Sequence, residues 1–155
     1  AEVFPFPKGM DIIASCSTIQ WFANLHSFFE RCHSSLNDGG FLIFSTFGQN
    51  NMKEISSLTG AVLPYRSKSE LENELLSLGY DIIYSGEEII NKSFDTPTSV
   101  LHHLKRTGVT GIRAQSWTKS TLEVFCREYT QQYNNGNHVS LTYHPIYIIA
   151  RKKTK

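Results

Sequence analysis

The pattern that most constrains the fold is a strand, a helix and a second strand within the first third of the chain. The first strand is expected at Asp11–Ser15, and the second, at Gly40–Phe47, is apolar almost throughout and reads as fully buried. Between them, apolar residues recur at helical spacing from Leu25 to Leu36. A strand, a helix and a strand in this order form a right-handed parallel crossover. The sequence therefore predicts a doubly wound α/β fold.

The residues before Asp11 lack the glycine-rich nucleotide loop that normally opens such a fold. They are also too few to supply the strands against which this unit usually packs. We therefore expect the second half of a doubly wound sheet, in a chain that is a fragment of a larger enzyme.

Capping signals place the next elements. Asn24 is a candidate N-cap for the first helix, and Asn37–Gly40 is its expected stop. A short helix is expected at 52–58, within a long connection. Ser67 and Glu70 then form a capping box that opens a further helix.

The second half of the chain departs from simple alternation. After Gly79 a strand begins at Tyr80, ending near Tyr84 or continuing towards Phe94. A helix starts at Thr96–Pro97, and another opens near Thr118 or Ser120, with Glu123 completing a capping box. The last strand is expected over Val139–Arg151. We interpret residues 1–155 as part of one domain, with a helical cover insertion at 96–135.

Composition excludes several classes of protein. A formal net charge of +1 gives no field that would gather nucleic acid, and no apolar run approaches the about 20 residues that cross a bilayer. The three cysteines, Cys16, Cys32 and Cys126, are odd in number and lack metal-ligand spacing. They favour reduced thiols and a cytoplasmic protein without a metal.

Five short stretches, in order and spacing, resemble the malonyl-acyl-carrier-protein O-methyltransferases of biotin synthesis. They are Asp11–Ser15, Ile19–Trp21 with Asn24 and Leu25, Leu104–Lys105 with Gly108 and Thr110, Trp117–Lys119, and Leu141–His144. Each stretch alone is a weak signal, and the ordered set covers nearly the whole chain.

The resemblance implies a class I, Rossmann-like methyltransferase fold, of which this chain supplies strands four to seven, the last of them antiparallel. It also implies S-adenosylmethionine as methyl donor and the malonyl group on an acyl-carrier protein as acceptor. The family's glycine-rich turn and acidic cofactor residue are not in this sequence. We therefore expect an incomplete cofactor pocket, no activity of the chain alone, and an exposed edge on the first strand that contacts a missing N-terminal segment or a second copy.

Methyl transfer to a carboxylate needs no general base, because a carboxyl group of pKa about 4 is already ionised at neutral pH. The site should instead contain a cation that holds the carboxylate. The candidates are Arg66, Arg106 and Arg113, with Lys105 behind them. Lys105, Arg106, Arg113 and Lys119 could also form a basic docking patch for an acidic carrier protein. The alternative for each is a solvated surface charge, which is the commoner role of such residues.

Other candidate site residues follow the ends of strands. Ser15, Cys16 and Ser17 end the first strand, where the resemblance implies contact with the methionine part of the cofactor. The candidate substrate residues are Gln20, Trp21, Lys105, Arg106, Tyr143 and His144. Trp21, Tyr143 and His144 could equally be packing residues.

Three functions remain open from the sequence. The first is methylation of malonyl-carrier protein at the start of pimeloyl synthesis. The second is a class I methyltransferase that acts on another small molecule, because a fold does not fix a substrate. The third is a non-catalytic chain that binds a carrier protein or a subunit.

Overall fold

The computed structural model describes residues 2, 6–61, 63–108 and 117–154. These residues form two compact units, each with its own hydrophobic core. The first unit is built from described residues within 1–49, 64–88 and 144–155, and the second from those within 50–63 and 89–143.

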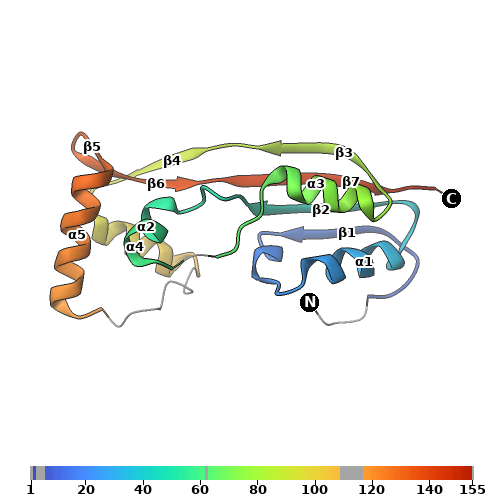
Figure 1. The fold of residues 1–155 in the computed structure, drawn as a ribbon, viewed down its shortest axis with the longest axis horizontal. Helices are drawn as coiled ribbons and strands as arrows, with labels where there is room; N and C mark the ends of the chain where they lie inside the picture. The colour runs from blue at the N-terminus through green and yellow to red at the C-terminus, as the bar shows by residue number, and fades with distance from the viewer. Residues whose placement is uncertain (1, 3–5, 62, 109–116, 155) are drawn as a thin grey trace. The chain divides into compact units, whose positions relative to one another are not determined.

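The first unit is a mixed four-stranded sheet with two α-helices (Figure 1). Its elements are β1 (Met10–Cys16), the 3-10 helix η1 (Ile19–Trp21), α1 (Leu25–Ser35), β2 (Leu36–Phe47), α3 (Lys68–Ser77), β3 (Tyr80–Glu87) and β7 (Pro145–Lys152). The strand order is β1-β2-β7-β3, in which β1 is parallel to β2 and β7 is antiparallel to both of its neighbours. The predicted half-sheet with an antiparallel last strand is confirmed.

Both helices pack their apolar stripes into one core on the sheet. Phe28 and Phe29 of α1 and Leu71 of α3 cluster with Leu42 and Phe44 of β2. The α1 stripe begins where Asn24 caps the helix, since its side chain accepts a hydrogen bond from the backbone N–H of Ser27 at 2.9 Å. The predicted cap is confirmed.

The prediction that the strand at Gly40–Phe47 is buried on both faces is wrong for the described residues. Side chains of β2 alternate between buried and half-buried positions, with Leu42 and Phe44 buried and Ile43 half-buried between them. On the same side as Ile43, Tyr147 of β7 is 40% exposed. The helices α1 and α3 cover one face of the sheet, which explains the alternation.

The second unit combines three helices with a small antiparallel sheet. The elements are α2 (Lys53–Thr59), β4 (Ile90–Phe94), α4 (Pro97–Arg106), α5 (Lys119–Tyr133), β5 (Asn134–Asn135) and β6 (His138–Tyr143). The sheet order is β4-β6-β5. Val100, Leu104, Phe125 and Tyr129 pack on Leu141 in its core. The helices predicted within 96–135 therefore form, together with two strands that this range did not include.

Two predicted strand boundaries are corrected. The single last strand expected over Val139–Arg151 is interrupted at His144, and β6 and β7 belong to different sheets. The strand from Tyr80 does not continue unbroken to Phe94, because β3 and β4 also belong to different sheets. In both places the chain passes from one unit to the other, and a period of two in the sequence does not reveal such a change.

Two local signals were also misassigned. The first helix ends at Ser35, before the expected stop at Asn37–Gly40, and β2 begins directly at Leu36, which pairs with Met10. The α5 capping box joins Thr118 to Thr121 and does not include Glu123, because the helix begins at Lys119 and Thr121 is its third residue.

No helix in the described part of the chain is both long and apolar enough to cross a membrane. The same residues contain no cluster of three or more His, Cys, Asp or Glu side chains that could hold a metal ion.

Candidate functional site

The turn that follows β1 has an unusual backbone. Ser17 lies in the left-handed region, with φ 47°, although it is not glycine. Its backbone N–H donates to the carbonyl oxygen of Ser45 at 3.0 Å and lies 3.2 Å from the Ser45 hydroxyl. These contacts with β2 hold the turn at the carboxyl edge of the sheet, which is where open α/β sheets bind ligands. Ser15 is half-buried there, and Cys16 and Ser17 are exposed.

Gln20 closes this turn from η1. Its side-chain amide donates to the carbonyl oxygen of Ser17 at 2.7 Å, and its amide oxygen lies 3.5 Å from the Thr46 hydroxyl on β2. Trp21, next in the chain, is 47% exposed. The structure therefore brings the predicted residues Ser15, Ser17 and Gln20 together at one edge of the sheet.

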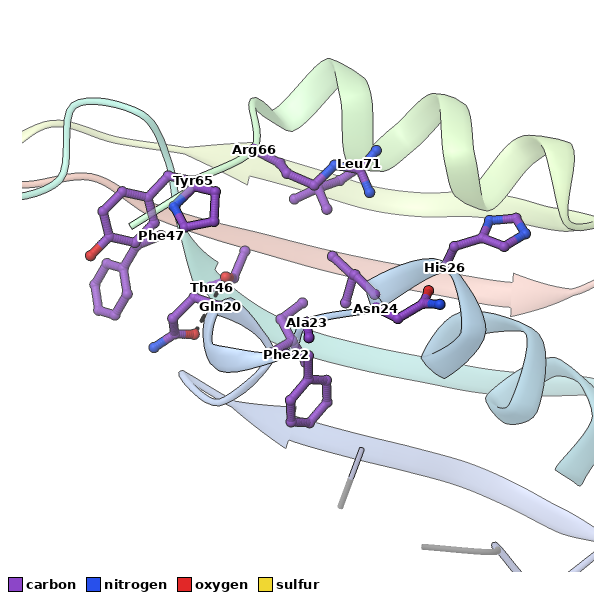
Figure 2. Close-up of a pocket in the computed structure, with 13 residues that line it drawn as sticks. Gln20, Phe22, Ala23, Asn24, His26, Thr46, Phe47, Tyr65, Arg66 and Leu71 are labelled. Carbon is purple, nitrogen blue, oxygen red and sulfur yellow. Dashed lines mark hydrogen bonds between the residues drawn. The ribbon is translucent and has the colours of Figure 1, made fainter. Parts of the chain in front are cut away.

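A pocket of about 370 Å³ lies at the same edge within the first unit (Figure 2). This volume is within the range of small-molecule sites. The described residues that line it come from η1 and the start of α1, the end of β2, and the segment that leads into α3. They are Ile19, Gln20, Phe22, Ala23, Asn24, Leu25, His26, Thr46, Phe47, Pro64, Tyr65, Arg66 and Leu71.

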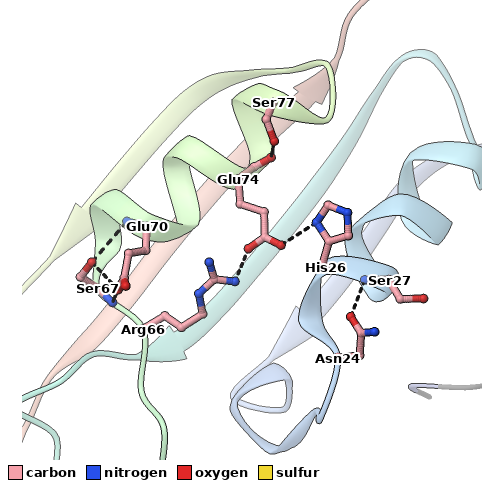
Figure 3. A network of polar contacts seen from close by, with 8 residues as sticks. All are labelled: Asn24, His26, Ser27, Arg66, Ser67, Glu70, Glu74 and Ser77. Atoms are coloured by element: carbon pink, nitrogen blue, oxygen red, sulfur yellow. Dashed lines mark hydrogen bonds and ion pairs between the residues drawn. The ribbon is translucent and has the colours of Figure 1, made fainter.

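A polar network borders the pocket and joins α1 to α3 (Figure 3). Arg66 forms an ion pair with Glu74 through its Nη1 atom. The second carboxylate oxygen of Glu74 lies 2.9 Å from Nδ1 of His26, in the first turn of α1. The Glu74 side chain is only 10% exposed, so both of its oxygens are used within the protein.

The capping box at the start of α3 fixes the backbone next to Arg66. The Ser67 hydroxyl accepts from the backbone N–H of Glu70 at 3.2 Å, and the Glu70 carboxylate accepts from the backbone N–H of Ser67 at 2.7 Å. The hydrogen bonds from Ser67 lower the pKa of Glu70 below its ordinary value. The predicted capping box is confirmed, and it places Arg66 immediately before the first helical turn.

The remaining predicted substrate residues are divided between the units. Lys105 and Arg106 are exposed in the last turn of α4, and Tyr143 ends β6, all in the second unit. The Tyr143 hydroxyl lies 2.8 Å from Nε2 of His103 on α4. Burial, followed by the charges of Lys92 and Arg106, lowers the pKa of His103. Arg113 lies outside the described residues, and Lys119 is exposed at the start of α5.

His144 belongs to the first unit and is only 7% exposed. Its Nε2 atom lies 3.0 Å from a carboxylate oxygen of Glu87, at the end of β3. Its carbonyl oxygen accepts from the backbone N–H of Gly48 at 2.7 Å. Whether His144 contacts a substrate stays a prediction.

Sequence reasoning did not find two members of the pocket network, His26 and Glu74. They are far apart in the sequence and meet because α1 and α3 share one core. Thr46 could have been noticed, because it is a polar residue inside the apolar run of β2.

No protein-family model matches the chain. It is 53% identical to the malonyl-[acyl-carrier protein] O-methyltransferase of Bacteroides thetaiotaomicron, over 99% of the chain and 62% of that protein. It is 42% identical to the protein of the same name from Acinetobacter baylyi, over 97% of the chain and 60% of that protein. The resemblance seen in the sequence is confirmed, and the chain spans about three fifths of the length of these curated relatives.

Solved structures show the same fold at low sequence identity. A candidate methyltransferase from Bacillus halodurans C-125 matches 99% of the chain and 75% of that protein, with a TM-score of 0.64 and 17% identity. The YcgJ protein of Bacillus subtilis matches 99% of the chain and 69% of that protein, with a TM-score of 0.59 and 14% identity. The fold is therefore the Rossmann-like fold of class I methyltransferases, as predicted.

Proposed function

We propose that the polypeptide that carries this chain transfers a methyl group from S-adenosylmethionine to the free carboxylate of malonyl-acyl-carrier protein, at the start of pimeloyl and biotin synthesis. The observation that carries the proposal is the 42–53% identity, over nearly the whole chain, to relatives that bear this name. The fold and a pocket at the carboxyl edge of its sheet support it.

The reaction is a single displacement. A carboxylate oxygen forms a bond to the methyl carbon while the bond from that carbon to the sulfonium sulfur breaks, which gives a methyl ester and a neutral thioether. The nucleophile is ionised at neutral pH, so catalysis rests on alignment and on exclusion of water. The apolar side chains Ile19, Phe22 and Leu71 of the pocket wall suit the second requirement.

For the methyl donor, we propose contacts from Ser15, Cys16 and Ser17. Cys16 and Ser17 are exposed, and Ser17 is held in a left-handed conformation next to β2, which suits a ligand that lies against the backbone. For the acceptor and its carrier we propose Gln20, Trp21, Lys105, Arg106, Tyr143 and His144. Lys105 and Arg106 carry exposed positive charges that would steer an acidic carrier protein.

We further propose that the chain alone is an inactive fragment with an incomplete cofactor pocket. The relatives are longer than this chain, and β1 has only one sheet neighbour, β2, among the described residues. Its other edge would pair with further residues of the same polypeptide or with a second copy. The three free cysteines fit a cytoplasmic location.

The decisive experiment supplies labelled S-adenosylmethionine to the intact polypeptide with malonyl-carrier protein, and with acetyl-carrier protein as the matched control that lacks a free carboxylate. Label should enter the malonyl substrate alone. Transfer to an unrelated small molecule would instead favour a different acceptor, and carrier binding without turnover would favour a non-catalytic chain.

Isothermal titration calorimetry tests whether the chain alone binds the methyl donor. The chain alone should bind no S-adenosylmethionine, and micromolar binding would contradict an incomplete pocket. Light scattering measures the oligomeric state of the intact polypeptide. A monomer would exclude pairing of the β1 edge with a second copy.

A further inference from the structure

The pocket beside η1 is mostly apolar and has one permanent charge. Among the described residues that line it, Arg66 is the only one with an always ionised side chain. A guanidinium at the wall of a mostly apolar concavity can hold an anion through charge-assisted hydrogen bonds.

Glu74 accepts from only some of the N–H donors of this guanidinium. The ion pair uses Nη1, and no described residue accepts a hydrogen bond from Nε or Nη2. The Arg66 side chain is 37% exposed, so a ligand can reach it. Since a guanidinium has five N–H groups in a planar fork, it can hold two carboxylates on two different edges.

The network also orients Arg66 before any ligand arrives. Glu74 anchors the guanidinium and is itself held by His26 of α1, while the capping box fixes the backbone at Ser67 (Figure 3). Both helices are rooted in the same core, where Leu71 and Leu75 lie with the phenylalanines of α1. A side chain that is already fixed loses little conformational entropy when it binds a ligand.

Two neutral polar side chains of the pocket each make a hydrogen bond within the protein. Gln20 donates to the backbone of Ser17, and Asn24 accepts from the backbone of Ser27. Figure 2 shows Gln20 directed towards Thr46, with Arg66 on the α3 side of the pocket. Arg66 therefore offers this pocket a charged donor edge that no described residue accepts from.

We propose that Arg66 binds the carboxylate of the acyl acceptor in this pocket and that Glu74 is its positioning residue. The ligand is a short aliphatic chain that ends in a carboxylate. Arg66 holds one carboxylate oxygen and leaves the other to attack the methyl group. This assignment deepens the proposed function and rests on it for the identity of the reaction.

The binding test uses the full chain, with malonate as the probe and neutral malonamide as its matched control. Backbone amide NMR should show malonate shifts at the pocket, around Gln20, Thr46 and Leu71, and none with malonamide. Arg66→Gln should weaken malonate binding by about 10- to 100-fold, because a charge-assisted hydrogen bond contributes about that factor. Arg151→Gln, which removes an exposed charge paired with Asp81, should leave binding unchanged.

Two further variants separate positioning from folding. Arg66→Lys keeps the charge but loses the fork, so it should restore binding only in part. Glu74→Gln keeps the shape of the side chain but loses the ion pair, so it should weaken binding less than Arg66→Gln does. Far-UV circular dichroism of each variant checks that the chain is folded. Absence of malonate shifts in the wild-type chain, shifts elsewhere, or equal binding by folded Arg66→Gln would overturn the proposal.

Kinetics on the intact polypeptide test the same residue during the reaction. Arg66→Gln should lower kcat/KM for malonyl-carrier protein by about 10- to 100-fold, and Arg151→Gln should not change it. If the wild-type enzyme does not methylate this substrate, the proposed function fails, whereas malonate binding still decides the role of Arg66. If the wild-type enzyme methylates this substrate and Arg66→Gln has wild-type kinetics, the role of Arg66 is refuted while the proposed function stands.

Discussion

Replacement of Gly48 by alanine should destabilise the first unit through a steric conflict with His144. Gly48 follows β2, and its backbone N–H donates to the carbonyl oxygen of His144, the residue before β7. A Cβ atom at this position would lie 2.5 Å from Cε1 and 2.6 Å from Nδ1 of the His144 ring. Its φ lies outside the left-handed region, so lack of space, and not backbone strain, requires glycine here.

The size of the effect follows from these contacts. Carbon atoms in van der Waals contact are about 3.5 Å apart or more, so the ring must move by about 1 Å. It is 7% exposed, hydrogen-bonded to Glu87 and fixed by the backbone bond from Gly48, so it cannot move freely. Overpacking costs about 1–3 kcal/mol, and alanine regains about 0.4–1 kcal/mol by restricting the unfolded chain. We expect a net loss of about 1–2 kcal/mol.

A double-mutant cycle with His144→Ala measures the conflict directly. Urea unfolding followed by far-UV circular dichroism gives the free energy of unfolding for the wild type, both single variants and the double variant. Without the ring, Gly48→Ala should cost nothing or stabilise slightly, so the coupling energy should be about 1–3 kcal/mol. An equal cost of Gly48→Ala with and without the His144 ring would refute this reasoning.

Three further predictions concern single side chains. Burial raises the pKa of the Cys32 thiol to about 12. Iodoacetamide at about pH 8 should therefore alkylate the exposed Cys16 and spare Cys32 in the native chain, as measured by mass spectrometry. Equal labelling of the two cysteines would contradict this prediction. Hydrogen bonds from Ser67 lower the pKa of Glu70, so its stabilising contribution is present above its unfolded pKa of about 4.3 and is lost as the pH falls through the lower folded value. In Glu70→Gln the free energy of unfolding, measured by urea titration, should therefore fall less steeply as the pH is lowered. An unchanged slope would show that Glu70 makes no such contribution. Tyr129→Phe removes the hydrogen bond of 2.7 Å to the carbonyl oxygen of Ser140 and should cost about 1–2 kcal/mol in thermal unfolding, whereas an unchanged melting temperature would show that the bond adds nothing.

Local chemistry explains what could be predicted from the sequence. Asn24 and Ser67 cap helices because their side-chain oxygens reach the N–H groups of the next turn, whatever the rest of the fold does. The strand at Asp11–Ser15 and the antiparallel last strand were found through the family resemblance and through strand spacing, and both are confirmed.

The errors arise where tertiary structure decides. Residues 139–151 read as one strand because apolar residues recur through His144, yet the chain changes sheets there. Pro145 was the available signal, because proline donates no backbone hydrogen bond and marks a strand end. In the same way Arg66 was a candidate from the sequence, but its partners Glu74 and His26 are brought to it only by the packing of α1 and α3.

The position of β7 in the sheet differs from its position in the chain, and this difference matters during synthesis. β7 lies between β2 and β3 in the sheet, but it is the last of the four strands to leave the ribosome. Until β7 has been made, β2 and β3 each have an unpaired edge. The apolar faces of α1 and α3 then lack the part of their core that β7 supplies. The order β1-β2-β7-β3 can therefore form only after residues 145–152, the last of its four strands, have been made.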